Sequence, residues 1–524
     1  MTRPPLIIAQ VTLLLSVITL SLLTRVNAST EDLKIPNLGE SSTSLFSADY
    51  EYEIGRMWLR SFRGQAPLVN DPLLHSYLEN LTFELAQHSD LQDRRIELVI
   101  VDNPSINAFA VPGGVMGVHN GLFLYAETED EFATVMAHEI AHLSQRHFSR
   151  RMELAAQQGP MQLAGLLAGI LLAATVGTDA GLAAMTTAQG LAQDEQLRYS
   201  RSNEAEADRV GLRTLYEAGM DPYAAPQMFE RMLAATRYSS TNRVPEFMRT
   251  HPLSERRIAD TRTRAMQYPK RIRPVSLDFQ LMRARVEVHS AQTPEEAVAS
   301  FRAALQGQTR STEATTYGLV LALTAAGRPN EAALSLDSIW SENTDRIEYV
   351  IADAEIDLAR GNPQRAVATL EQRLELSPGN HPLTMAYADA LHQAGSPHLA
   401  EAALVEQSRR VSNDPGLWYL LAEVQGLAGN IIGLHRSRAE YFIMINALDA
   451  AEKQLGYAQA LTDRDFTTSS VSNERLREMQ SMRAEMDRGE APPRNDRRYG
   501  LSVSAKASIR SSGRIAAVAI SVGT

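Results

Sequence analysis

The segment His138-Glu139-Ile140-Ala141-His142 has the residue types and the spacing of a metal site. On a helix, two histidines four residues apart lie on one face and can share a tetrahedral Zn²⁺. The carboxylate of Glu139 lies beside them, within reach of a water molecule at the open metal position. The alternative is a pair of solvated histidines on a surface helix. Apolar Val135 and Met136 argue against it, because they direct this helix into a core, where unpaired imidazoles would be costly.

A catalytic zinc needs a third protein ligand, and without any cysteine in the chain that ligand is a histidine or a carboxylate. The segment Tyr199–Asp208 predicts the start of a helix on which Glu204 and Asp208 share a face. One of these carboxylates could bind the metal while the other accepts a hydrogen bond from a ligand histidine. Glu206 is expected to point away into solvent. A charged, solvated helix face is the alternative interpretation of this segment.

Three elements must position these residues. The periodicity predicts a helix over Glu127–His147, with acidic residues at its positive end, and a buried strand over Ile96–Val101. The segment Val111–Val118 predicts a strand with a glycine-rich kink, confined to a sheet edge by Pro112. Such an edge could take up an extended polypeptide as an added strand. The residues expected to contact substrate there are Val111, Gly113, Gly114, Val115 and Met116.

The composition sets the broad class. A length of 524 residues allows about two to four domains, and 44% hydrophobic with 22% charged residues is typical of a globular protein. The net charge of -11 excludes a general nucleic-acid binder, so no nucleic-acid partner is expected. The absence of cysteine excludes disulfides, thiolate metal sites and a lipoprotein anchor.

The N-terminus indicates the compartment. Leu6–Leu23 is an apolar run that ends near Val26-Asn27-Ala28, which predicts a signal peptide over residues 1–28 cleaved near Ala28. The alternative is an uncleaved membrane anchor. We expect the periplasm of a Gram-negative bacterium and no transmembrane span in the mature chain. The apolar segment Leu163–Val176 is too short to span a bilayer and predicts a core helix or an apolar loop.

A repeat of 34 residues occupies the C-terminal half. It is marked by Gly327, Gly361, Gly395 and Gly429, with Pro329, Pro363 and Pro397 two residues after the first three and Ala332, Ala366 and Ala400 five after them. This period is that of tetratricopeptide repeats; an irregular helical bundle would not predict equal spacings. We therefore expect a metallopeptidase domain over 45–267, a repeat array over 290–465, a terminal helix over 466–493 and a disordered basic tail over 494–524.

Several motifs together carry a family resemblance. His138-Glu139-x-x-His142 and Ser200-Arg201-x-x-Glu204-x-x-Ala207-Asp208, preceded by Asn107-Ala108-Phe109-Ala110 and Pro112-Gly113-Gly114, resemble the zinc peptidase family that includes HtpX and the CAAX prenyl proteases. The resemblance implies an α+β, mostly α chain: a zincin-type metallopeptidase domain with a small sheet, followed by an α-solenoid of tetratricopeptide repeats. It also implies one Zn²⁺ per chain, held by His138, His142 and Glu204. Glu139 would be the catalytic base. Asp208 would be a second catalytic residue, which either holds a ligand histidine in the right tautomer or donates a hydrogen bond to the oxyanion.

The signal peptide and the repeats narrow the resemblance to the periplasmic branch of that family. It implies a zinc metalloendopeptidase that degrades misassembled or unfolded outer-membrane β-barrel proteins, assists their assembly, and meets the assembly machinery through the repeats. An alternative is a chaperone or scaffold that acts through the repeats with a latent or vestigial peptidase site. A third interpretation is a metal-dependent hydrolase that acts on something other than peptides.

His251 precedes Pro252, which pushes it into an extended loop conformation near the end of the peptidase domain. Neutral imidazole is a good zinc ligand, so His251 could be a fourth, regulatory ligand that displaces the catalytic water and keeps the enzyme latent. The alternative is a loop histidine that contacts substrate or solvent.

Overall fold

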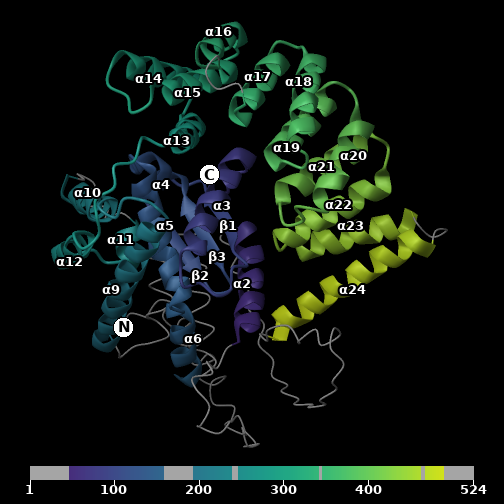
Figure 1. Ribbon diagram of the computed structural model, residues 1–524. Coiled ribbons are helices and arrows are strands. Elements are labelled where there is room, and N and C mark those ends of the chain that lie inside the picture. The colour runs from purple at the N-terminus through teal and green to yellow at the C-terminus, as the bar shows by residue number, and fades with distance from the viewer. Residues whose placement is uncertain (1–46, 159–192, 239–245, 341–344, 462–465, 489–524) are drawn as a thin grey trace, which may run out of the picture. The chain divides into compact units, whose positions relative to one another are not determined.

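The computed structural model describes residues 47–158, 193–238, 246–340, 345–461 and 466–488 (Figure 1). The predicted signal peptide, the apolar segment Leu163–Val176 and the predicted tail lie outside these residues. The chain is mostly helical with one small sheet. The elements of its first half are α2 (Ala48–Arg63), α3 (Pro72–Gln87), β1 (Glu97–Val101), β2 (Ala108–Val111), β3 (Val115–His119), α4 (Asn120–Tyr125), α5 (Glu129–Ser144), α6 (His147–Gln158), α9 (Gln193–Glu217), α10 (Ala224–Tyr238), α11 (Glu246–Thr250) and α12 (Glu255–Ala265).

The sheet has three strands in the order β1-β3-β2, with β1 parallel and β2 antiparallel to β3. Alternating residues of β1 face opposite sides, as the pleat requires. Val99 and Val101 pack with Trp58 and Phe62 of α2, whereas Leu98 and Ile100 join the large core that α3 and α5 share. Helices therefore cover both faces of the sheet.

The predicted strand Val111–Val118 is instead a hairpin, so this expectation was wrong. β2 ends at Val111, and Gly113 and Gly114 reverse the chain with φ values of +74° and +75°, which favour glycine. Each glycine also lies against other backbone, since a Cβ on Gly113 would stand 2.4 Å from the carbonyl oxygen of Glu51. β3 is the central strand, because Val115 pairs with both Glu97 of β1 and Val111 of β2. The residues of β3 therefore do not form a sheet edge, and the edge on this side of the sheet is β2.

Helix α5 begins two residues later than the predicted Glu127 and ends three residues before the predicted His147. The Thr128 side chain caps it by accepting a hydrogen bond from the Glu131 N–H, and acidic residues occupy its first turn. The helix ends at Ser144 rather than His147, because Arg146 adopts a left-handed conformation with φ +52°. The chain turns there, and α6 starts at His147.

The C-terminal half is a series of paired helices. They are α13 (Leu277–Ser290), α14 (Pro294–Gln306), α15 (Thr312–Ala325), α16 (Pro329–Trp340), α17 (Ile347–Ala359), α18 (Pro363–Leu376), α19 (His381–Gln393), α20 (Pro397–Ser408), α21 (Pro415–Leu427), α22 (Ile431–Met444), α23 (Leu448–Leu461) and α24 (Phe466–Arg488). Each of the four glycines of the 34-residue period lies in the turn between the two helices of one pair, from α15 and α16 to α21 and α22. Their φ values lie between +69° and +76°. Ala332, Ala366 and Ala400 are fully buried, which is the close packing that small residues permit.

Helix α13 packs into the core of the N-terminal half, which comprises α2 to α12. The Phe279 ring lies 5.6 Å from that of Phe132 and 6.4 Å from those of Tyr77 and Phe123, measured between centroids. Phe279 is fully buried. A domain boundary at residue 267 would therefore remove part of this core.

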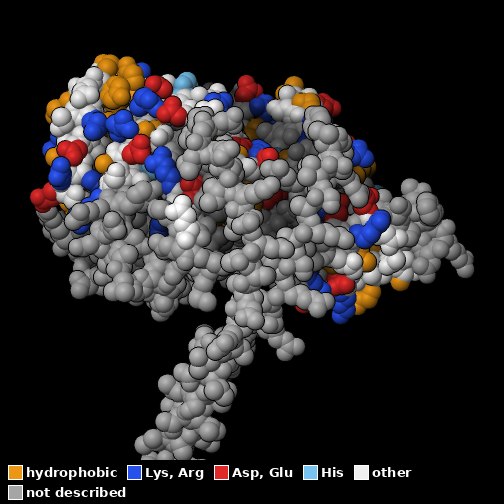
Figure 2. Space-filling model, turned by 90° about the horizontal axis from the view of Figure 1, so that it is seen from below, with side chains coloured by type: hydrophobic (Ala, Val, Ile, Leu, Met, Phe, Trp, Pro, Cys, Tyr) orange, Lys and Arg blue, Asp and Glu red, His pale blue; other side chains and the backbone are white. Residues whose placement is uncertain are grey.

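None of the helices in the described ranges is long and apolar enough to cross a bilayer. On the face in Figure 2, basic and acidic side chains of the described residues are interspersed.

Candidate metal centre

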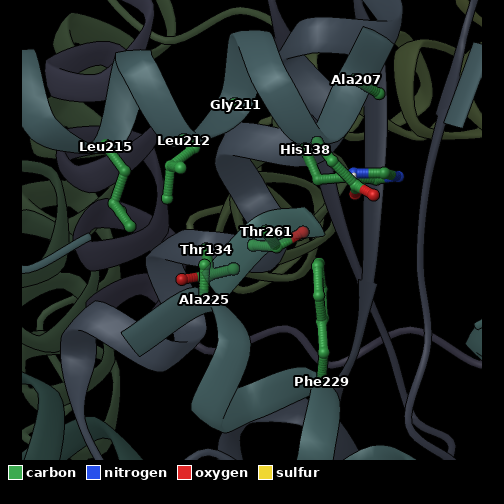
Figure 3. Close-up of a pocket in the computed structure, with 10 residues that line it drawn as sticks. Thr134, His138, Ala207, Gly211, Leu212, Leu215, Ala225, Phe229 and Thr261 are labelled. Atoms are coloured by element: carbon green, nitrogen blue, oxygen red, sulfur yellow. Dashed lines mark ion pairs between the residues drawn. The ribbon is translucent and has the colours of Figure 1, made fainter. Parts of the chain in front are cut away.

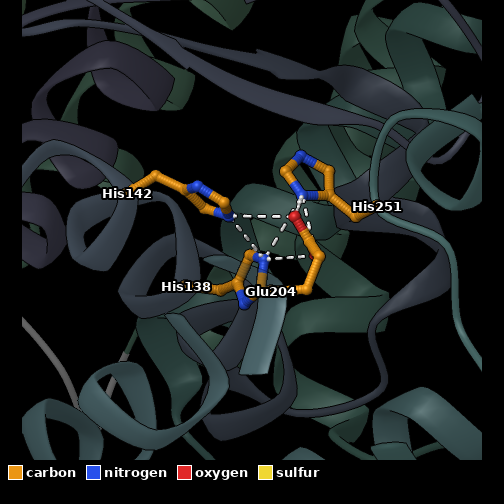
Figure 4. Close-up of side chains that lie close together, drawn as sticks. All are labelled: His138, His142, Glu204 and His251. Carbon is orange, nitrogen blue, oxygen red and sulfur yellow. Dashed lines mark hydrogen bonds and ion pairs between the residues drawn. The ribbon is translucent and has the colours of Figure 1, made fainter. Parts of the chain in front are cut away.

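Four side chains converge at the middle of the N-terminal half (Figure 4). His138 and His142 come from α5, Glu204 comes from α9, and His251 comes from the bend after α11. One potential ligand atom from each lies within 4.8 Å of the others. Three of these residues are those expected to bind the metal, and the fourth is the predicted regulatory histidine.

The spacing of these atoms fits a tetrahedral ion. With metal–ligand distances of about 2.1 Å, the corners of a tetrahedron lie about 3.4 Å apart. His138 Nε2 lies 3.1 Å from His142 Nε2, 3.3 Å from His251 Nδ1 and 3.4 Å from Glu204 Oε2. Glu204 Oε1 lies 3.4 Å from His142 Nε2 and 3.0 Å from His251 Nδ1. Three imidazoles and one carboxylate are also donors that zinc accepts.

Glu139 lies beside this group and is almost completely buried, with 1% of its surface exposed. Burial raises the pKa of its carboxyl. The nearby His251 and His138 partly counter this rise, as does a hydrogen bond from the backbone N–H of Ala110 in β2. Its Oε1 lies 3.4 Å from His251 Nε2, yet no group in the described part of the chain donates a hydrogen bond to this oxygen. A buried carboxylate oxygen without a donor is suited to bind and deprotonate a water molecule.

Asp208 supports His138 from behind. Its Oδ1 lies 3.1 Å from His138 Nδ1, the ring nitrogen that faces away from the other ligand atoms. Arg257 in α12 donates to both Asp208 oxygens at 2.8 Å, and it also lies 3.0 Å from Glu204 Oε2. Burial alone would raise the pKa of Asp208, but His138 and Arg257 hold it below its usual value. The carboxylate is therefore charged and fixed in place.

Comparison with known proteins decides the family. Residues 72–265, which contain all of these side chains, match the sequence profile of Peptidase family M48. The chain is also 33% identical over 427 residues to the β-barrel assembly-enhancing protease of Escherichia coli, covering 81% of this chain and 87% of that one. The chain belongs to peptidase family M48. It is a metalloendopeptidase, and residues 357–424 match the tetratricopeptide repeat profile.

Other relatives in family M48 share different amounts of the chain. A Vibrio cholerae protein named putative β-barrel assembly-enhancing protease is 34% identical and covers 77% of this chain and 83% of its own length. The mitochondrial metalloendopeptidase OMA1 of Schizosaccharomyces pombe is 32% identical over 35% of this chain and 50% of its own. The family likeness in OMA1 is thus confined to a shorter stretch of 182 residues.

Close packing of α9 on α5 holds the M48 site together. Gly211 of α9 lies against the α5 backbone, where an added Cβ would stand 3.1 Å from the Ala137 carbonyl oxygen and the His138 nitrogen. Figure 3 shows the small pocket beside this contact, with His138 near Ala207, and Thr134 and Phe229 on its wall. Because the helices approach so closely, Glu204 and Asp208 both reach the histidines of α5.

The surroundings keep Glu204 ionised. Only 4% of its surface is exposed, and burial by itself would raise the pKa of its carboxyl. The charges and hydrogen bonds of His251, His138 and His142 outweigh that effect and hold the pKa well below its usual value. A carboxylate that is buried yet charged is what a cation site requires.

Two contacts of the M48 site were not predicted from the sequence. Glu206 points away from the ligand atoms and its side chain remains 30% exposed, as expected, but its Oε2 also lies 3.1 Å from His147 Nε2. His147 Nδ1 in turn lies 3.0 Å from His142 Nδ1. Arg257 was also missed. The only sequence signals are a third histidine five residues after His142 and an arginine shortly after His251-Pro252.

Proposed function

We propose that this M48 chain is a zinc endopeptidase in which His138, His142 and Glu204 hold the ion and Glu139 is the catalytic base. The observation that carries the proposal is the buried group of ligand atoms at tetrahedral spacing beside an unsatisfied Glu139 oxygen. A bound zinc ion would polarise the scissile carbonyl and make a water molecule more acidic.

The remaining steps belong to the protein. Glu139 takes a proton from the attacking water, and its burial favours this role because the raised pKa strengthens it as a base. The same carboxyl then delivers the proton to the leaving amine. Asp208, fixed by Arg257, keeps the His138 proton on Nδ1 and leaves Nε2 free to bind the ion.

The substrate would lie along β2 rather than along the predicted Val111–Val118 strand. The Ala110 N–H reaches Glu139, so the free edge of β2 borders the catalytic base. A polypeptide added to this edge would bring its backbone carbonyls to the site. This mode suits extended or unfolded segments, because only backbone that is not already paired can add as a strand.

We infer unfolded or misassembled outer-membrane β-barrel proteins as the substrates. Two similar proteins bear the name of β-barrel assembly-enhancing proteases, and unfolded barrel strands are the extended segments that the β2 edge could take up. The repeats would bind the substrate or the assembly machinery through their helix pairs. The predicted signal peptide would place the enzyme in the periplasm.

Purified protein should cleave an unfolded outer-membrane β-barrel protein and spare the same protein folded in detergent micelles. Fragments would be measured by gel electrophoresis and mass spectrometry over several hours. Removing the metal with a chelator should abolish cleavage, and adding one equivalent of Zn²⁺ should restore it. Zinc-independent cleavage, or equal cleavage of the folded barrel, would contradict the proposal.

The scaffold alternative predicts a different result in cells. If the peptidase site were vestigial, a Glu139→Gln chain would support barrel assembly as well as wild type does. The complete buried ligand group disfavours that alternative, because four converging polar side chains are costly to keep without an ion. Loss of function with Glu139→Gln in cells would reject it.

We further propose that His251 is a displaceable fourth ligand that keeps the enzyme latent. Its Nδ1 lies near His138 and Glu204 at ligand spacing, so the four protein atoms leave no corner for a water molecule. The His251 ring stacks on Phe247, with centroids 4.7 Å apart, and the backbone N–H of His251 donates to the Phe247 carbonyl. Opening the site would therefore require the segment after α11 to move.

His251→Ala should raise basal cleavage of an unfolded protein, because the open state would no longer have to compete with the fourth ligand. If the open state, in which His251 has left the site, is populated at only a few per cent in wild type, the cleavage rate should increase by about tenfold or more. Initial rates would be compared at equal zinc content, with exposed His88→Ala as the control. A fall in activity with zinc unchanged would instead assign His251 to substrate contact.

A further inference from the structure

The ring of His142 has a second nitrogen, and the fold gives it a partner that the ligand set does not include. His142 turns Nε2 toward the other ligand atoms, while its Nδ1 lies 3.0 Å from His147 Nδ1. His147 Nε2 lies 3.1 Å from Glu206 Oε2. We propose that His147 and Glu206 are positioning residues that fix the ring of His142 and so set the metal affinity; this rests on the proposed metal site.

The position of His147 depends on the break between α5 and α6. In a continuous helix, residues five apart lie on different faces, so His147 would point away from His142. The left-handed conformation of Arg146 turns the chain, and the His147 ring then meets the His142 ring edge to face, with centroids 4.9 Å apart. Only 3% of His147 is exposed. A non-glycine residue at positive φ is costly, which suggests that the turn has a function.

The pairings allow one arrangement of protons. If His142 binds the ion through Nε2, its proton is on Nδ1 and must be donated to an acceptor. The acceptor is His147 Nδ1, so the proton of His147 is on Nε2. That proton is donated to the carboxylate of Glu206. The chain His142–His147–Glu206 thus holds the first ring in the tautomer and the orientation that a ligand needs.

Two arginines contact the carboxylate of Glu206 in addition to His147. Arg150 of α6 and Arg209 of α9 each place a guanidinium nitrogen 3.6 Å from its carboxylate. Helix α9 therefore supplies three carboxylates with separate tasks: Glu204 faces the ion, Asp208 supports His138, and Glu206 supports His142 through His147.

The test is zinc affinity, measured on the full-length protein by competition with a chromophoric chelator. His147→Ala should weaken zinc binding by about 10- to 100-fold, the usual effect of removing the partner of a ligand histidine. Glu206→Gln should weaken it measurably but less, because its amide oxygen can still accept the His147 N–H but no longer carries a charge. His147→Asn should recover most of that loss, because its side-chain oxygen can accept the His142 N–H. Glu217→Gln, an exposed carboxylate on the same helix, should match wild type.

A double variant separates positioning from packing. In His147→Ala/Glu206→Gln, the loss should not exceed that of His147→Ala alone, since Glu206 acts only through His147. Additive losses would mean that Glu206 acts through its arginine partners, and unchanged affinity in the single variants would also overturn the proposal. Melting temperatures of the metal-free proteins check that each variant folds. If wild type itself bound no zinc, the proposed metal site would fail instead.

Discussion

Glu139→Gln is expected to keep its zinc and its fold and to lose proteolysis by about 10²- to 10⁴-fold, the usual contribution of a general base. Glutamine has nearly the same shape as glutamate, but its amide cannot take the proton of the attacking water. The carboxylate is buried and accepts a hydrogen bond from the Ala110 N–H. The change should therefore affect chemistry far more than packing.

The measurement is the initial rate of cleavage of an unfolded protein, with zinc content and melting temperature determined on the same samples. Both wild type and His251→Ala should serve as backgrounds, so that slow basal turnover does not hide the loss. Glu53→Gln makes the same chemical change at an exposed position of α2 and should leave the rate unchanged. Activity of Glu139→Gln within a few fold of its background would remove Glu139 from the mechanism.

The parts of the site that the sequence predicted are those fixed by local geometry. Residues four apart on a helix share a face wherever that helix lies, so His138 with His142, and Glu204 with Asp208, could be paired from spacing alone. The 34-residue period was predictable for the same reason, because each glycine ends its own helix at positive φ.

The rest depended on how distant backbone segments meet. The pattern around Gly113 and Gly114 fitted a kinked strand as well as a hairpin, and only the pairing of β3 with both neighbours distinguishes the two. His147 was missed because its contact with His142 exists only if Arg146 adopts a left-handed conformation, to which arginine has no special tendency. Arg257 reaches Glu204 and Asp208 from another helix, and no spacing along the chain connects them.

Glu204→Gln should reduce zinc affinity by well over about 100-fold, since the loss of a ligand's hydrogen-bond partner alone costs about 10- to 100-fold. The neutral amide removes the one charged ligand from a group that otherwise contains imidazoles, and it also leaves the Arg257 guanidinium with one charged partner, Asp208, instead of two. Zinc content after dialysis and chelator competition would measure the effect.

The neighbouring carboxylates make this prediction discriminating. Glu206→Gln should weaken binding less than Glu204→Gln and still bind one zinc when the metal is in slight excess, because Glu206 reaches the site only through His147. Glu217→Gln should behave as wild type. The loss of zinc affinity should therefore decrease in the order Glu204, Glu206, Glu217, as the carboxylates of α9 lie farther from the proposed ion. If Glu206→Gln emptied the site while Glu204→Gln kept its zinc, the assignment of the third ligand would be wrong, and the face of α9 turned toward α6 would have to hold the ion.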